Sequence, residues 1–161
     1  MLNASIVLFN HSIDDIKPLV ESLRSSALMN DVFLIDNSPA EVVGFRNLPA
    51  VYIFNNKNLG YGAAHNIALH KTLEQNVLYH LVINPDIQLD YRILDELTDY
   101  MDKNPDIGHI MPRVLNPDGT IQYLCKLLPR PSDLLFRRFL PTGWTQKSNE
   151  HFELRKSGYD K

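Results

Sequence analysis

The sequence has too little cysteine for a disulfide framework and no apolar run long enough to span a membrane. Its 161 residues include a single cysteine, Cys125, which cannot form an internal disulfide and which we expect to be a buried structural thiol. A membrane-spanning helix needs about twenty consecutive apolar residues, and no segment approaches that length. The start of the chain also lacks the basic region and long apolar core of a secretory signal. These absences predict a cytoplasmic protein without a transmembrane anchor.

Positive charge is not in excess either. The chain has 16 Lys and Arg against 19 Asp and Glu, a net charge of -3 at pH 7. Because nonspecific nucleic-acid affinity comes from neutralising phosphates with cations, this balance argues against a nucleic-acid partner. The segment 126–138 is a local exception that gathers four basic residues among apolar ones. We interpret it as a solvated helix end; the alternative is contact with a phosphate or with an anionic membrane surface, by peripheral association at the inner face of the membrane.

What the sequence does contain is an alternation of short apolar runs with amphipathic helical patterns. Ser12 and Asp15 are spaced as a helix N-cap and its partner, so one helix is expected to run from there to about residue 25. The alternation predicts an α/β fold with a Rossmann-like, mostly parallel sheet and helices on both faces. Strands are expected at 5–9, 32–35, 51–54 and 80–83, and the two further helices around 63–73 and 93–101.

The pattern changes after residue 107. Short strand-like pieces are expected at 107–110 and 120–123, separated by a turn over residues 116–119. From about residue 142 the sequence is polar and weakly patterned. We therefore expect one domain over residues 1–141 and a polar tail over 142–161.

The predicted strands deliver polar residues at their carboxyl ends, where ligands collect in open α/β sheets. These residues are Asn10, Asp36 and Asp86. Asp86 ends an Asn-Pro-Asp turn, where its carboxylate could bind Mg²⁺ or Mn²⁺ that also holds a diphosphate. The same tripeptide recurs at 116–118, where a plain β-turn is the better explanation.

The glycine-bearing loop at residues 60–65 nearly matches the dinucleotide fingerprint G-x-G-x-x-G. It fails because His65 occupies the last position and because the loop follows the third strand instead of the first. A glycine turn at a helix start still exposes backbone N–H groups that suit an anion or a nucleotide, although it could merely permit a tight turn. His65 and His70 are five residues apart and do not form a zinc-binding pair on one helix face. Neither G-x-S-x-G nor a P-loop is present.

Four ordered sequence blocks together resemble glycosyltransferase family 2, and most closely its rhamnosyltransferase-like branch. The blocks are Val7–Asn10, Leu34–Ser38, the N-x-N-x-G-x-G-x-A-x-N pattern of residues 56–66, and Ile83–Asp86. Residues 111–113 and 116–122 also look like the sequence that follows in that branch. The resemblance implies the GT-A fold and transfer of a sugar from a nucleotide-diphosphate donor, such as dTDP-rhamnose, to a glycan or lipid-linked acceptor in polysaccharide biosynthesis. Mn²⁺ or Mg²⁺ would be the cofactor.

The resemblance also implies a role for individual residues. Asp86 stands at the last position of the family's D-x-D motif and would be the metal ligand, whereas Asn84 replaces the first aspartate. The residues implied to lie along the nucleotide are Phe9 and Asn10 beside the base, Asp36 at the base or ribose, and Asn58, Gly60, Asn66 and Asn84.

The chain departs from the family toward its C-terminus. Similar members carry a later acidic E-D-type motif whose carboxylate deprotonates the acceptor, and this motif is absent here. Glu150 and Glu153 lie in the polar tail without the surrounding pattern, so no catalytic residue is predicted. We expect the donor-binding part of a sugar transferase, truncated in this chain. The alternative is a noncatalytic nucleotide-binding or interaction module of the same fold. A phospho-acceptor receiver domain is disfavoured because Phe9 and Asn10 replace the acidic pair after its first strand.

Overall fold

The computed structural model describes residues 1–124 and 127. The chain divides into two units, Met1–Gly108 and His109–Lys161. The helices and strands of the described residues lie in the first unit. They are β1 (Leu2–Leu8), α1 (Ile13–Arg24), β2 (Met29–Asp36), the 3-10 helix η1 (Val43–Asn47), β3 (Val51–Phe54), α2 (Tyr61–Glu74), β4 (Tyr79–Ile83) and α3 (Ile93–Lys103).

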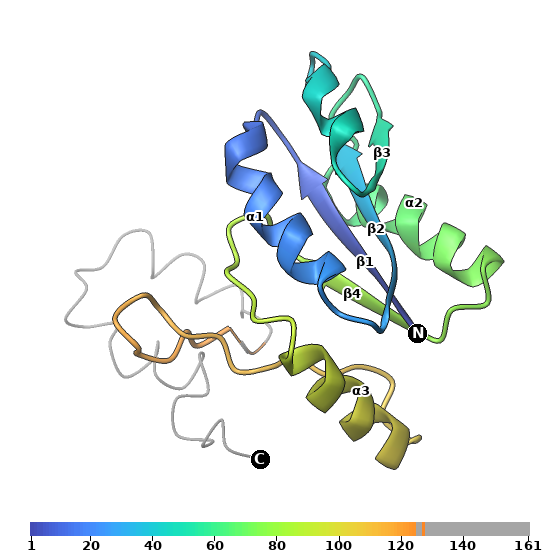
Figure 1. The fold of residues 1–161 in the computed structure, drawn as a ribbon, viewed down its shortest axis with the longest axis vertical. Coiled ribbons are helices and arrows are strands. Elements are labelled where there is room, and N and C mark those ends of the chain that lie inside the picture. Colours follow the sequence, from blue (N-terminus) through green and yellow to red (C-terminus); the bar gives the residue numbers. More distant parts are fainter. Residues whose placement is uncertain (125–126, 128–161) are drawn as a thin grey trace. The chain divides into compact units, whose positions relative to one another are not determined.

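The four strands form one sheet in the order β3-β2-β1-β4, and every neighbouring pair is parallel. Helices α1 and α2 lie on opposite sides of this sheet (Figure 1). Parallel strands need crossover connections, and these helices supply two of them. The structure therefore confirms the predicted α/β architecture with a parallel sheet and helices on both faces.

Two apolar clusters hold the layers together. Neighbouring residues of β2 alternate between them: Val32 and Leu34 pack in the cluster with α1, whereas Phe33 and Ile35 pack in the cluster with α2. This alternation explains why the sequence shows a continuous apolar run there. A central strand covered on both faces needs apolar side chains in both registers.

Helix α1 begins where the sequence predicts. The Ser12 hydroxyl accepts a hydrogen bond from the Asp15 backbone N–H, and the Asp15 carboxylate accepts one from the backbone N–H of Ser12. This capping box satisfies two N–H groups that the first helical turn would otherwise leave without a partner. The side chains that α1 buries follow at helical spacing: Ile16, Leu19, Val20 and Leu23.

The prediction of a strand at residues 107–110 is wrong. The Ile107 N–H continues the turn after α3 by donating to the Asn104 carbonyl oxygen at 3.0 Å, and Gly108 is a weak strand former. The expected piece at 120–123 is reduced to an isolated antiparallel bridge between Leu115 and Ile121. The predicted turn over residues 116–119 is confirmed, with the Gly119 N–H donating to the Asn116 carbonyl oxygen at 2.9 Å.

Several expectations concern residues outside the described part of the chain. They are the buried thiol of Cys125, the basic segment 126–138 and the domain boundary at residue 141 with its polar tail. Within residues 1–124 and 127, no helix has the length and apolar character needed to cross a bilayer.

Candidate functional site

The strand order reverses between β1 and β4. The chain passes from β1 to β2 and then β3 on one side, whereas β4 lies on the other side of β1. In open α/β sheets such a switch point leaves a crevice at the carboxyl ends of the strands, and ligands bind there. Asn10 follows β1 at this point and Asn84–Asp86 follow β4, and the side chains of Asn10, Asn84 and Asp86 are exposed. Predicted site residues thus flank the switch point.

Asp36, at the end of β2, is fully buried and holds the adjacent loop in place. One carboxylate oxygen accepts from the Ser38 backbone N–H at 2.9 Å, and the other accepts from the Tyr52 hydroxyl at 2.6 Å. The Ser38 hydroxyl in turn accepts from the Asn10 N–H at 2.8 Å. Burial, followed by the hydrogen bond to Asp36, raises the pKa of Tyr52. Asp36 therefore supports the loops around Asn10, and its contact with a base or ribose stays a prediction.

Asn10 itself has a left-handed backbone, with φ of 58°. Asparagine tolerates this region better than most residues, but the conformation still costs energy and needs support from its surroundings. The bond from its N–H to Ser38 supplies part of that support. The backbone at Asn10 therefore leaves the extended conformation of β1, and the residue is exposed.

A chain of amide groups ties the loop before α2 to the end of β2. Asn55 donates to the Asn37 side-chain oxygen at 2.9 Å, and the Gly60 N–H donates to the Asn58 side-chain oxygen at 2.9 Å. The Asn37 side-chain nitrogen lies 3.4 Å from both the Asn58 oxygen and the Gly60 carbonyl oxygen. Two of the predicted residues, Asn58 and Gly60, are thus brought together in one loop.

The N-terminus of α2 has the features of an anion-binding turn. Its N-cap is Gly60, which has φ of 83° and provides no side-chain cap, and the first turn has no acidic residue. The positive end of the helix dipole is therefore not offset locally. A Cβ atom added to Gly62 would meet nothing within 4 Å, so the space beside this turn is open. Exposed N–H groups here could bind a phosphate.

Tyr61 connects this turn to the end of β4. Its hydroxyl donates to the Asn84 side-chain oxygen at 2.8 Å, and burial raises its pKa. The bond engages the carbonyl oxygen of Asn84, so its amide NH₂ group is the part left to face a ligand. In the sequence pattern of residues 56–66, Tyr61 stands at a variable position between two glycines. Its pairing with Asn84, 23 residues away, is a tertiary contact without a local sequence signal.

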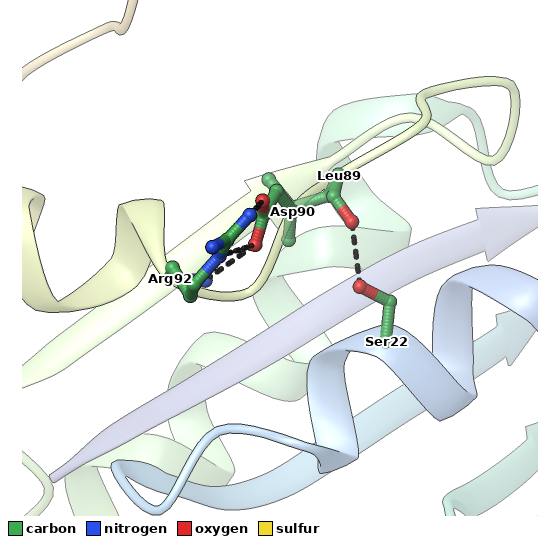
Figure 2. A network of polar contacts seen from close by, with 4 residues as sticks. All are labelled: Ser22, Leu89, Asp90 and Arg92. Atoms are coloured by element: carbon green, nitrogen blue, oxygen red, sulfur yellow. Dashed lines mark hydrogen bonds and ion pairs between the residues drawn. The ribbon is translucent and has the colours of Figure 1, made fainter.

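Asp86 lines a cleft of about 510 Å³ between α1 and the loop after β4. The remaining lining residues are His11, Asp15, Pro18, Leu19, Ser22, Pro85, Ile87, Gln88 and Leu89. Figure 2 shows how the loop is anchored: the Ser22 hydroxyl of α1 donates to the Leu89 carbonyl oxygen, and an ion pair between Asp90 and Arg92 follows. The cleft is therefore bounded by a loop fixed to the helix that it faces.

The described residues contain no group of three or more His, Cys, Asp or Glu side chains arranged to hold a metal ion. Asp86 nevertheless has an exposed carboxylate, and Mg²⁺ is often held by one or two carboxylates together with phosphate oxygens and water. From the described residues, a cation shared with a diphosphate would need only this carboxylate.

The remaining predicted residues are not linked to this loop network by the contacts described above. Phe9 is 47% exposed, and its backbone N–H donates to the ring of His11. Asn66 lies exposed on α2. Their roles beside the nucleotide stay predictions.

No protein-family model matches the chain, and no curated protein matches it closely enough to be a relative.

Proposed function

We propose that the chain is the donor-binding part of a GT-A glycosyltransferase that binds a nucleotide-diphosphate sugar at the carboxyl edge of its parallel sheet. The supporting observation is the switch point between β1 and β4, flanked by Asn10 and Asn84–Asp86. The uncapped N-terminus of α2 is linked to the same edge through Tyr61. A sheet edge that offers backbone donors, an amide and a carboxylate suits a nucleoside diphosphate with its cation.

Each group has a distinct proposed task. The N–H groups at the start of α2 and the amide NH₂ of Asn84 would donate to phosphate oxygens, and Asp86 would hold Mn²⁺ or Mg²⁺. The base lies beside Phe9 and Asn10, whose loop is fixed through Asp36. Because the diphosphate gains charge as it leaves the sugar, donors and a cation placed there stabilise the transition state.

The chain has no residue that we assign as the general base. Glu150 and Glu153 lie outside the described residues, and the family's later acidic motif is absent from the sequence. We therefore propose that this chain binds the donor, for which the resemblance suggests dTDP-rhamnose, and that transfer to a glycan or lipid-linked acceptor requires residues beyond it. A noncatalytic module would also bind the nucleotide, but a longer form of it would not transfer sugar.

The test is calorimetric titration with UDP and with dTDP, each with and without Mn²⁺. We expect binding that Mn²⁺ strengthens and that Asp86→Ala makes independent of the metal. Asp118→Ala is the matched control, because Asp118 ends the second Asn-Pro-Asp tripeptide and is engaged by Thr120 in a turn. The control should keep the metal dependence. Absence of binding to either nucleotide would contradict the proposed function.

A further inference from the structure

A row of polar side chains, four of them buried and one, His80, half-buried, lies between α2 and the sheet, and the proposed function uses none of them. It comprises Asn3 and Ser5 of β1, His65 and Thr72 of α2, and His80 of β4. The side chains of Asn3, Ser5, His65 and Thr72 are at least 96% buried. Buried polar groups need hydrogen-bond partners, so the positions of their hydrogens are strongly constrained.

The constraint begins at Thr72. Its hydroxyl donates to the Ala68 carbonyl oxygen at 3.0 Å, so its oxygen acts as an acceptor for the other two neighbours. Those neighbours are the Asn3 amide nitrogen at 3.0 Å and His80 Nδ1 at 2.7 Å. His80 Nδ1 therefore carries a hydrogen, and in the neutral ring Nε2 is an acceptor.

The chain continues from His80 through Ser5 to His65. The Ser5 hydroxyl lies 2.7 Å from His80 Nε2 and 2.7 Å from His65 Nδ1. Ser5 donates to His80 and accepts from the Nδ1–H of His65. The second ring nitrogen of His65, Nε2, then has a lone pair and no hydrogen. This atom is buried without a hydrogen-bond partner. Two neutral rings thus satisfy every donor in the row.

An additional proton has no acceptor in this row. If His80 becomes doubly protonated, Ser5 must accept from it, and either the Ser5 hydroxyl or His65 Nε2 is left with an unpaired hydrogen. If His65 is protonated instead, its Nε2–H has no acceptor. A buried donor without a partner and a buried charge without a counter-ion both destabilise the folded state.

The surroundings offer no compensating charge. Among the described residues, no carboxylate forms an ion pair with either ring. The groups facing the rings are the Ser5 hydroxyl from β1, the Thr72 hydroxyl and the Tyr61 ring from α2, and the other histidine. Asp31 belongs to the outer part of the network, where its carboxylate accepts from Gln75.

We infer that these contacts make the packing of α2 against β1 and β4 proton-sensitive: α2 is held on the sheet while both rings are neutral and is released in acid. The inference does not depend on the proposed function. Because α2 also carries the Gly60–Gly62 turn at its N-terminus, any ligand bound at that turn is lost together with the packing of the helix.

The direction of the pH dependence follows from the same surroundings. Burial, and next the charge of neighbouring His65, lowers the pKa of His80 from 6.5 to about 4, and burial also lowers the pKa of His65. Between pH 6.5 and about pH 4, the unfolded chain binds more protons than the folded one. This contribution to stability is complete above about pH 6.5 and is lost as the pH falls toward about 4.

The test compares urea unfolding of the full chain at about pH 7.5 and about pH 5. We expect the urea midpoint of the wild type to be lower at the acid pH. In the double variant His65→Gln/His80→Gln, this fall in midpoint should be at most half as large. His70→Gln is the matched control, since His70 is an exposed histidine of the same helix. It should show the full wild-type fall. An equal fall in the double variant and the control would overturn the inference.

A second measurement does not require the double variant to fold. Proton–carbon NMR spectra of the wild-type rings, titrated with acid, report the protonation of each histidine directly. We expect both rings, His65 and His80, to titrate below the usual range of histidine, and the α2 amides to lose protection before those of α1 when the rings protonate. Ordinary titration near 6.5 by both rings, with α2 still protected, would overturn the inference.

Discussion

At the scale of single residues, the sheet edge separates side chains that support the site from side chains that are free to meet a ligand. Asp36 has both carboxylate oxygens engaged within the protein, by Ser38 and by Tyr52. Asp86 is exposed and lines a cleft. A buried carboxylate that loses a donor costs about 1–3 kcal/mol, so Asp36 contributes through the geometry of its loop. Of the two carboxylates, Asp86 is the one suited to direct contact.

Tyr61 is the residue that most clearly joins two parts of this edge, and removing its hydroxyl tests that role. In Tyr61→Phe the Asn84 side chain is no longer held by the bond of 2.8 Å. We expect nucleotide affinity to fall about 5-fold, corresponding to roughly 1 kcal/mol for one hydrogen bond, with the fold unchanged. Calorimetry measures the affinity and circular dichroism checks the fold. Tyr91→Phe, at an exposed tyrosine before α3, should bind as the wild type does. Equal affinities of the two variants would refute this role.

At the scale of elements, the turn into α2 depends on a backbone conformation that glycine adopts at little cost. Gly60 has φ of 83°, and a Cβ atom there would meet nothing within 4 Å. Gly60→Ala should therefore lower the free energy of unfolding by about 1 kcal/mol through backbone strain alone. Gly62→Ala is the matched control, because it adds the same methyl group inside the helix with equal space around it. It should be neutral or slightly stabilising. Urea unfolding compares them, and a loss as large in Gly62→Ala would contradict this explanation.

The strength of the sequence signal decided which elements could be predicted. Both ends of β3 could be predicted because Val51–Phe54 is a continuous apolar run. The start of α1 could be predicted because Ser12 and Asp15 form a capping box, in which each side chain bonds the backbone N–H of the other. β1 begins at Leu2. The predicted start was later because Asn3 interrupts the apolar pattern of the sequence. That side chain is buried all the same, since its hydrogen-bond partners come from α2 and β2. Such partners are distant in sequence and leave no periodic pattern.

The candidate site shows the same division. The polar ends of β1, β2 and β4 could be expected at one edge, because parallel strands place their carboxyl ends together. Tyr52 and Tyr61 were not predicted, since each acts through a single tertiary hydrogen bond. The pairing of His65 with His80 was missed for a related reason: the spacing of His65 and His70 excluded one zinc geometry, but no local pattern reveals that Ser5 joins His65 to His80.

At the scale of the whole molecule, the elements that build the candidate site belong to the unit Met1–Gly108. Among the described residues, both apolar clusters lie within it, and so do the four strands of the sheet. A domain is stable when its own core is complete, so residues 1–108 should fold without the rest of the chain.

A fragment of residues 1–108 should therefore unfold cooperatively in urea, and its nucleotide affinity should lie within about 3-fold of that of the full chain, less than 1 kcal/mol. A fragment of residues 1–90 is the control: it omits α3 and with it Leu94, a fully buried side chain of the cluster that includes α1. Losing a buried leucine costs about 2–5 kcal/mol even when the rest of its helix remains, so this shorter fragment should be much less stable. Noncooperative unfolding of 1–108 would mean that the second unit completes the core. Cooperative unfolding with lost affinity would instead mean that residues after 108 contribute to the nucleotide site.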